Sequence, residues 1–332
     1  MQLALAWTIL LAVASALIGC GDRDALILYC SVDETFGKMV LDRFERTTGL
    51  KVEAVYDTEA GKTTGLISRI RAEADRPRAD VFFSGEVFHT VLIAREGLLE
   101  PYAPKTAGDI PVRFKDPQDR WTGIGLRGRV VAFDTKLTPP EALPARWEQL
   151  AEPAFAAKTA FANPLFGTTS GHVAAMFALW GSDRGRAFLL GLRDGGAKME
   201  AGNSSAVRSV MAGRVALCMT DTDDVRVARQ HTPTLDQRFL DLGDGGTLFI
   251  PTTVALIKGC AHPESARRLI DFLVSAEVER LLARSASGNI PVRADLRKEL
   301  GLTLPPTTQL SYDRIADALP VSTRAVREIL IR

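Results

Sequence analysis

The chain has 332 residues, of which 46% are hydrophobic and 24% charged, so it is long enough for two domains with buried cores. Its formal net charge is only +1 and its arginines are spread along the chain, which argues against a dedicated nucleic-acid-binding surface. The four histidines are scattered, and no cysteine–histidine group has the spacing of a zinc site.

The N-terminal segment differs from the rest of the chain. Residues 3–18 are almost wholly apolar, and Gly19 and Cys20 follow directly, before a charged stretch at 21–24. The length suits the core of a signal peptide, and small and apolar residues directly before a cysteine resemble a bacterial lipobox. The alternative is a short signal anchor with an incidental cysteine. We expect residues 1–20 to be a lipoprotein signal peptide, with lipid attached at Cys20 and the protein anchored in the periplasm or on the outer face of the cell membrane.

Residues 26–98 predict three strand–helix units in a row. The continuous apolar run at 25–30 is typical of a buried parallel strand, and 51–56 and 80–83 are expected to be the second and third strands. Apolar residues at helical spacing follow each of the three. Alternating strands and helices indicate an α/β fold.

A second α/β set follows, enclosed by two segments that cross between the sets. Its expected strands are 159–162 and 215–219, and its helices are expected to begin at Thr168 and Asn203. The expected crossing segments are 129–133 and 246–258. A long helix over 264–284 and a final helix over 323–331 complete the chain. We expect a clam-shell in which lobe 1 comprises 21–129 and 250–332, and lobe 2 comprises 130–249.

Loops after the strands of lobe 1 carry polar and acidic residues. Ser31 and Asp33 follow the first strand, Glu59 the second and Glu86 the third. Ligands of open α/β sheets bind at these carboxyl ends of strands. Carboxylates brought together repel unless a cation neutralises them, and they suit Fe(III), Mn, Ca, Mg or an ammonium group. The alternative is that each acid only stabilises a helix start.

Lobe 2 carries a denser acidic group. Asp221, Asp223 and Asp224 occupy three of four positions after the strand at 215–219. Such density favours a ligand role, because three neighbouring acids repel one another more than a helix cap requires.

Two helix starts in lobe 2 carry hydroxyl and amide groups. Helix N-termini have N–H groups that attract anions, although simple capping would use the same residue types. Together with the acids, these starts predict a ligand with cationic and anionic parts. The residues concerned are Thr169, Ser170, Asn203 and Ser204.

Several segments resemble bacterial ferric-iron-binding proteins, which belong to the family 1 extracellular solute-binding proteins of ABC importers. The resemblance covers nearly the whole mature chain and is more specific for the family than for the ligand. It implies a type II periplasmic-binding-protein clam-shell, a permease partner in the inner membrane, no enzymatic activity and no cofactor. The segments are 28–33, 44–52, 79–83, 213–217 and 262–266.

The resemblance also implies a ligand set. The two adjacent tyrosines that often coordinate iron in the family fall on Asp223 and Asp224, so the tyrosine pair is missing. A first-lobe ligand falls near Asp33 and a glutamate near Glu86, which makes these four residues the expected metal ligands. The positions that hold the accompanying anion look like Thr169, Ser170 and Asn203.

The leading hypothesis is therefore capture of ferric iron or another hard metal ion with a synergistic anion, for ABC import, by a monomer. The first alternative is a zwitterionic organic solute such as an aminoalkylphosphonate. A second is an envelope hydrolase or transferase, although no nucleophile elbow, phosphate loop or zinc-protease motif is present. A third is a lipoprotein that reports ligand to a receptor.

Overall fold

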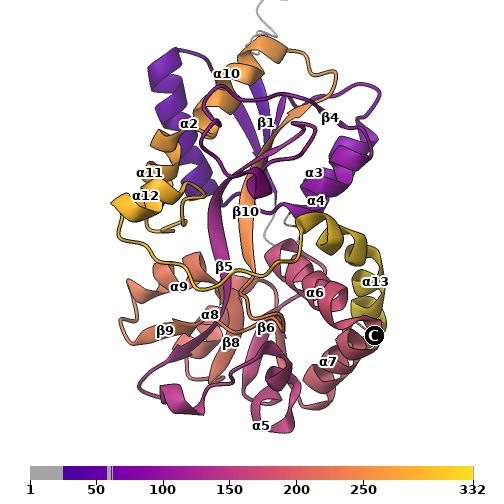
Figure 1. Cartoon of the computed structure of the whole chain (residues 1–332), viewed down its shortest axis with the longest axis vertical. Coiled ribbons are helices and arrows are strands. Elements are labelled where there is room, and N and C mark those ends of the chain that lie inside the picture. The colour runs from indigo at the N-terminus through magenta and orange to yellow at the C-terminus, as the bar shows by residue number, and fades with distance from the viewer. Residues whose placement is uncertain (1–24, 58–60, 62, 332) are drawn as a thin grey trace, which may run out of the picture.

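The computed structural model describes residues 25–57, 61 and 63–331, which form two α/β lobes along the long axis of the molecule (Figure 1). Strands of both lobes join in one path, in the order β2-β1-β3-β10-β5-β8-β6-β7, with β4 beside β10 and β9 beside β5. The expected two-lobed α/β architecture with two crossing strands is confirmed. Cys20 and Glu59 lie outside the described residues.

Lobe 1 contains the three predicted strand–helix units. Its strands are β1 (Leu26–Cys30), β2 (Val52–Tyr56), β3 (Val81–Ser84) and β4 (Leu99–Glu100). Its helices are α2 (Glu34–Thr48), α3 (Thr64–Ala72), α4 (Phe88–Arg95), α10 (Pro263–Leu273), α11 (Ala276–Arg284) and α12 (Ala294–Glu299). Strand β1 pairs in parallel with both β2 and β3. The single helix expected over 264–284 is two helices, because Ser275 caps α11 by accepting a hydrogen bond from the Val278 N–H.

Lobe 2 is built around a second parallel set. Its strands are β6 (Thr159–Ala162), β7 (Lys198–Glu200), β8 (Leu217–Asp221) and β9 (Leu235–Arg238). Its helices are α5 (Pro153–Ala156), α6 (Gly167–Trp180), α7 (Ser182–Asp194), α8 (Asn203–Met211) and α9 (Thr222–Arg229). Strand β6 pairs in parallel with β7 and β8. The acids expected in a loop after β8 therefore lie partly in the first turn of α9.

Strands β5 (Thr122–Asp134) and β10 (Phe249–Ile257) cross between the lobes. The first half of β5 pairs with β10, and its second half pairs with β8 and β9. Strand β10 also pairs with β3 and β4, so it ends in lobe 1. The register of the β5–β10 pair shifts between Pro251 and Thr252, but Pro251 does not break the strand. Every residue of β5 is buried, including two arginines.

A buried ion pair holds the first half of β5 in lobe 1. Glu279 of α11 is 1% exposed, and its Oε1 accepts hydrogen bonds from the N–H groups of Gly125 (3.0 Å) and Val292 (2.7 Å). Its Oε2 accepts one from Nη1 of Arg293 at 2.9 Å. Arg293 also bonds to Asp109 and to two backbone carbonyls. Both members of the pair are thus engaged, as buried charges require.

The last helix is longer than expected and lies against both lobes. It is α13 (Tyr312–Leu330), with Pro320 inside it, where a helix over 323–331 was predicted. It packs on α6 and α7 of lobe 2 and on α4 of lobe 1. Most of its contacts are therefore outside the lobe to which residues 250–332 were assigned. The rings of Phe88 and Tyr312 meet edge to face at 6.2 Å between centroids. A Cβ on Gly171 would lie 1.9 Å from the Phe88 ring, so α6 packs closely on α4 at this point.

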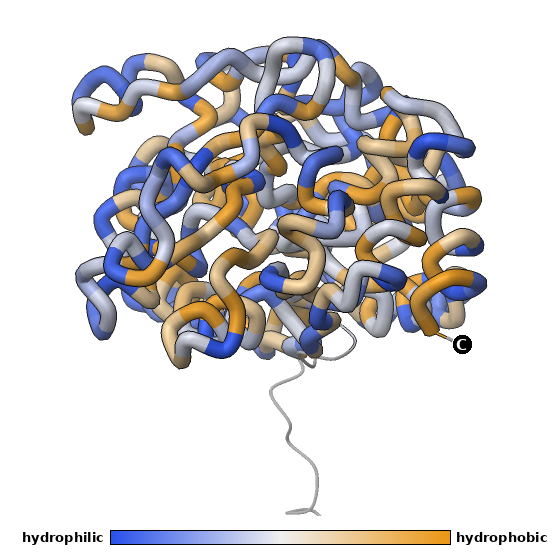
Figure 2. Tube along the Cα trace, turned by 90° about the horizontal axis from the view of Figure 1, so that it is seen from below, coloured by the Kyte–Doolittle hydropathy of each residue, from blue (hydrophilic) through white to orange (hydrophobic). Residues whose placement is uncertain are grey.

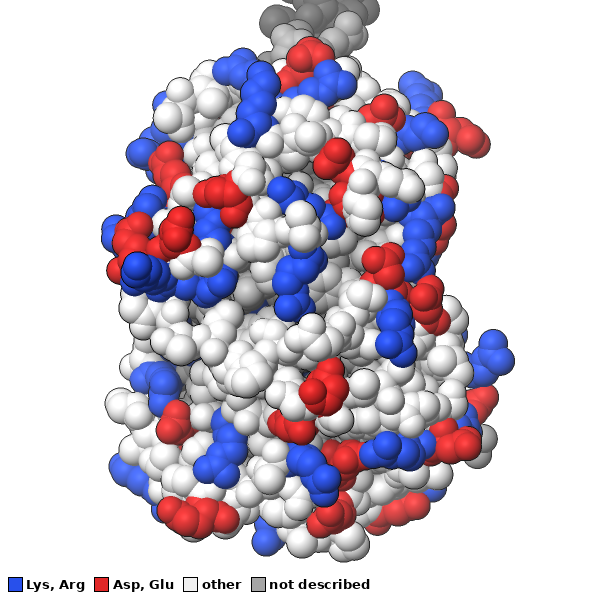
Figure 3. Space-filling model, viewed as in Figure 1, with Lys and Arg blue, Asp and Glu red and all other residues white. Residues whose placement is uncertain are grey.

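Hydrophobic segments concentrate in the interior and hydrophilic ones along the outside of the trace (Figure 2). On the face shown in Figure 3, basic and acidic side chains are intermixed, with no field of one sign. Within the described residues, no helix is both long and apolar enough to cross a membrane. The three cysteines of this part, Cys30, Cys218 and Cys260, are free thiols.

Candidate ligand-binding cleft

A cleft between the lobes brings together most of the predicted site residues. The space between its walls is about 580 Å³, a volume that includes open solvent at its mouth. Lobe 1, β5 and lobe 2 all contribute to its walls, as expected for strand ends that face each other. The predicted residues that line it are Ser31, Asp33, Glu86, Thr169, Asn203, Ser204, Asp221, Asp223 and Asp224. Ser170 is buried and does not line the cleft.

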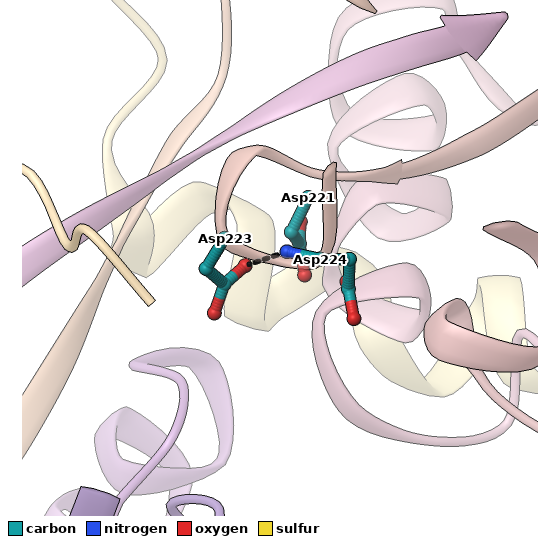
Figure 4. A group of neighbouring side chains, drawn as sticks. All are labelled: Asp221, Asp223 and Asp224. Atoms are coloured by element: carbon teal, nitrogen blue, oxygen red, sulfur yellow. Dashed lines mark hydrogen bonds between the residues drawn. The ribbon is translucent and has the colours of Figure 1, made fainter. Parts of the chain in front are cut away.

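Three aspartates lie together where β8 meets α9 (Figure 4). One carboxylate oxygen from each of Asp221, Asp223 and Asp224 lies within 4.8 Å of the others. The Asp224 N–H donates to Oδ1 of Asp223 at 3.1 Å. The Asp224 carboxylate accepts hydrogen bonds from Ser204 (3.1 Å) and Thr220 (3.0 Å). The group offers hard oxygen ligands at a spacing that one cation could bridge.

The carboxylate of Asp221 belongs to a buried hydrogen-bond network. It is 1% exposed, and its Oδ1 accepts a 2.7 Å hydrogen bond from Nη1 of Arg129. Its Oδ2 accepts hydrogen bonds from the Thr168 hydroxyl and from Nδ2 of Asn203, the latter at 2.9 Å. Both oxygens are therefore used within the protein. This favours a supporting role for Asp221, where the sequence predicted ligand contact.

Arg129 is fully buried on β5, and its guanidinium donates hydrogen bonds to several side chains of lobe 2. Besides Asp221, it donates to Thr168 at 3.2 Å, to Thr169 at 3.4 Å and to Nδ1 of His172 at 3.2 Å. His172 is also fully buried, and burial together with the nearby Arg129 charge holds its pKa well below the ordinary value. A neutral, enclosed imidazole that accepts from Arg129 is a structural residue.

Arg127 lies two positions earlier on β5 and lines the cleft. It is 9% exposed, and its Nε lies 3.2 Å from Oδ2 of Asp223. That ion pair lacks hydrogen-bond alignment, so Nε has no hydrogen-bond partner among the described residues. Burial alone would lower the pKa of Arg127, but the cleft carboxylates outweigh it and raise the pKa above the ordinary value, in the order Asp223, Asp221, Asp33 and Asp224.

The lobe 1 wall is made of groups that already have partners. The hydroxyl of Ser31 accepts from the Gly85 N–H at 2.9 Å and from Thr63 at 3.2 Å. Glu86 is 1% exposed and accepts from the N–H groups of Phe88 (2.6 Å) and His89 (3.2 Å) at the start of α4. Glu86 thus stabilises a helix start, the alternative that the sequence left open for these acids.

Two helices of lobe 2 point their N-termini at the cleft without a side-chain cap among the described residues: α6 after Phe166 and α8 after Gly202. Asn203 is the first residue of α8, as expected for a helix start, and the N-cap position is Gly202. The Asn203 side chain accepts from the Thr169 hydroxyl at 3.0 Å and donates to Thr168 at 3.0 Å. The first N–H groups of each helix have no acceptor within the helix, which suits an anion.

Arg127 and Arg129 were not among the site residues predicted from the sequence. A signal was present, because the run 122–134 is otherwise apolar at most positions, and arginines two apart in a strand share a face. A charged residue in a strand buried on both faces needs a carboxylate partner. The spacing alone could not show which acids supply it.

The chain matches the family of bacterial extracellular solute-binding proteins over residues 76–312. It belongs to this family. Members bind solutes and are not enzymes, so the expectation that the protein is no enzyme is confirmed. The expected resemblance to bacterial ferric-iron-binding proteins among the solute-binding proteins is confirmed as well.

Curated relatives carry two kinds of name. The major ferric iron-binding protein of Neisseria meningitidis serogroup A is 26% identical over 269 residues, which is 77% of this chain and 78% of that protein. A putative 2-aminoethylphosphonate-binding periplasmic protein of Salmonella typhimurium is 26% identical over 270 residues, or 80% of this chain and 76% of that protein. Both are about equally similar to this chain.

Solved structures share the fold. Iron-bound HitA from Pseudomonas aeruginosa superposes with a TM-score of 0.79 at 24% identity, covering 91% of this chain and 99% of that one. The ferric binding protein from Campylobacter jejuni gives 0.83 at 19% identity, covering 92% and 99%. These similarities confirm the periplasmic-binding-protein clam-shell.

None of the four tyrosines, all of which are described, lines the cleft. Tyr29 donates to Glu73, Tyr102 to Asp271 and Tyr312 to a backbone carbonyl, while Tyr56 lies beside Gly37. Any hard metal ion held here would be bound by carboxylates and not by phenolates.

Proposed function

We propose that the protein captures ferric iron or another hard metal ion, together with an anion, and delivers it to an ABC permease in the inner membrane. The aspartate group at the start of α9 carries this proposal, because it offers closely spaced hard oxygen ligands on the wall of a cleft. Asp33, Asp223 and Asp224 would bind the metal. Relatives named for ferric iron support the choice of cargo.

The anion is part of the proposal because the cleft also carries positive charge. Arg127 and two helix N-termini face the same space as the aspartates. A bare cation would be repelled by Arg127, whereas a cation with an anion would satisfy both kinds of group. Thr169 and Asn203 flank the helix starts where the anion would bind.

A second candidate is a zwitterion such as an aminoalkylphosphonate. The buried Arg127 favours it, because a guanidinium is well suited to bind a phosphonate while nearby carboxylates bind an amine. A relative named for 2-aminoethylphosphonate is as similar as the iron-named one.

Native mass spectrometry with elemental analysis separates the two candidates. The chain starting at Gly21, which holds every described residue, is purified without chelator as the expected monomer. We expect stoichiometric metal that is lost when Asp223 and Asp224 are changed to alanine. Changing the exposed acids Glu141 and Asp183 to alanine is the matched control and should leave the metal in place. A metal-free protein that retains a small organophosphorus mass would overturn the metal proposal and support the zwitterion.

The same method tests export and anchoring. We propose that the full chain is cleaved before Cys20 and carries diacylglycerol on that cysteine, which holds it at the periplasmic or outer membrane surface. The mass of the protein extracted from membranes should show both changes. An unmodified Cys20 would contradict the anchor without affecting the proposed cargo.

A further inference from the structure

A groove between the lobes continues from the acidic end of the cleft. It lies where α8 and α9 of lobe 2 face α2 and the segment after α11 of lobe 1 (Figure 1), and its space is about 1130 Å³, including open solvent. Both the groove and the cleft are lined by Asp33, Ser204, Asp223 and Asp224, whereas Arg127 and the start of α6 line the cleft alone. The groove therefore adjoins the carboxylates and not Arg127.

Beyond the shared polar residues, the lobe 2 side of the groove is apolar. On α9, Val227 lies four positions after Asp223, and so on the same face one turn further along the helix. On α8, Val207 and Met211 are also four positions apart and follow Ser204. Because an α-helix rises 1.5 Å per residue, the apolar side chains begin about 6 Å from the acids.

Lobe 1 shows the same order of polar and apolar residues. Asp33 is the N-cap residue of α2, and Phe36 lines the groove three positions later. Ala286, after α11, adds another apolar side chain from this lobe. Phe36, Met211 and Val227 are each partly exposed. Apolar faces of two lobes thus border one open space, which leaves room for an apolar group between them.

The remaining polar side chains of the groove are turned toward solvent. Thr35, Arg208 and His231 are all exposed, and Arg208 donates a 2.7 Å hydrogen bond to Ser205. The charged groups that the groove and the cleft share are all carboxylates. A molecule that occupied both spaces would therefore need a cationic centre at their junction.

We infer that the cargo carries an apolar group next to its cationic centre, and that this groove binds that group. The inference rests on the proposed capture of a cation in the cleft and adds the class of cargo. Two sources share this chemistry: an ammonium ion with a hydrocarbon substituent, and a metal ion that arrives with an organic chelator. A bare metal ion or an unsubstituted aminoalkylphosphonate would leave the groove to water.

Isothermal titration of the metal-free chain starting at Gly21 tests the first source. The probes are 2-aminoethylphosphonate and its two benzyl-substituted isomers, one with the benzyl group on the carbon next to nitrogen and the other on the carbon next to phosphorus. We expect the first isomer to bind about 10- to 100-fold more tightly than the unsubstituted probe, the range for burying a group of the size of a phenylalanine side chain. The second isomer should gain nothing, because its benzyl group is attached at the anionic end.

Ga(III) complexes of benzohydroxamate and acetohydroxamate test the second source, because these chelators differ only in a phenyl or a methyl group. Tighter binding of the benzohydroxamate complex, by about 10-fold or more, indicates a metal ion with an organic chelator. A preference in the phosphonate series indicates a substituted ammonium ion. Either preference supports the inference.

A double variant locates the apolar group in the groove. Met211→Gln with Val227→Thr keeps the side-chain volumes nearly constant but makes the lobe 2 face polar, so the preference for the apolar probe should fall toward one. Met211→Gln alone serves if the double variant does not fold, since Met211 is partly exposed at the last position of α8. The matched control is Met199→Gln with Val321→Thr, at exposed positions outside the groove, which should keep the wild-type preference.

Two results would overturn the inference. One is a wild-type protein that binds 2-aminoethylphosphonate or Ga(III) but shows no apolar preference in either series, in which case the proposed capture stands and only the role of the groove fails. The other is a preference that survives in the folded variant even where all affinities fall together, because the two apolar faces would then meet each other as the lobes close. Failure to bind any probe would overturn the proposed capture as well.

Discussion

Two buried ion pairs hold β5, one on each side of the point where it crosses between the lobes. In lobe 1, Glu279 binds Arg293 and the N–H of Gly125. In lobe 2, Asp221 binds Arg129. Both carboxylates are 1% exposed and have every oxygen occupied. The strand is therefore held to lobe 1 at Gly125 and to lobe 2 at Arg129.

The pairs differ in what else they touch. Glu279 and Arg293 bond to backbone groups and to Asp109, away from the cleft. Asp221 shares its carboxylate with Thr168 and Asn203, which line the cleft. The first pair stabilises the fold, whereas the second also positions two groups that face the ligand. Equal burial of two ion pairs thus does not mean equal involvement in binding.

The largest expected effect comes from removing either carboxylate. Asp221→Ala leaves the buried Arg129 without a carboxylate, and Glu279→Ala leaves Arg293 with only the exposed Asp109, so each change should lower the free energy of unfolding by about 3–5 kcal/mol. Urea denaturation measures this loss. Titration of the folded fraction with methylphosphonate should show weaker binding only for Asp221→Ala, because Thr168 and Asn203 lose their shared partner.

Asp183→Ala, on the exposed face of α7, serves as the control and should stay within about 0.5 kcal/mol of wild type. If Glu279→Ala weakened binding as much as Asp221→Ala, the proposed difference between the two pairs would be wrong.

A smaller effect is expected where lobe 1 meets α9. Gly288 has a φ of +56°, and a Cβ there would lie 2.0 Å from Cδ of Arg226. Gly301 has a φ of +66° but open space around it. Gly301→Ala should therefore cost only the backbone strain, about 1 kcal/mol. Gly288→Ala should cost about 1–2 kcal/mol more and increase the radius of gyration in small-angle scattering, because the lobes are pushed apart.

Adding Arg226→Ala to Gly288→Ala should remove the extra cost, since the colliding side chain is gone. Persistence of the full effect in the double variant would show that the strain lies in the backbone of the loop and not between the lobes.

The smallest expected effect concerns the pH dependence of the lobe 2 network. His172 stays neutral in the folded protein because its pKa is depressed, whereas in the unfolded chain it binds a proton near pH 6.5. Stability is then lost as the pH falls below about 6.5, by up to about 1.4 kcal/mol per pH unit. Urea midpoints at pH 7 and pH 5 should differ less for His172→Gln than for wild type. An unchanged difference would mean that His172 does not contribute.

The sequence predicted most of the framework and part of the site. The three strand–helix units at the start of lobe 1 were found to within a few residues, because strands and helices alternate there and the first strand is a continuous apolar run. The strand ends placed Asp33, Asp223 and Asn203 in one cleft. Whether a carboxylate is already engaged depends on contacts between distant segments. Only the structure shows that Glu86 stabilises α4 and that Asp221 pairs with Arg129.

The close packing of Phe88 against Gly171 and Tyr312 has a thermodynamic consequence. Phe88 is fully buried between α4, α6 and α13, although the first of these helices belongs to one lobe and the second to the other. Any motion that separates α4 from α6 must bring this ring into contact with water. Closing around a ligand would then carry a negative heat-capacity change, whatever the chemistry of the ligand itself.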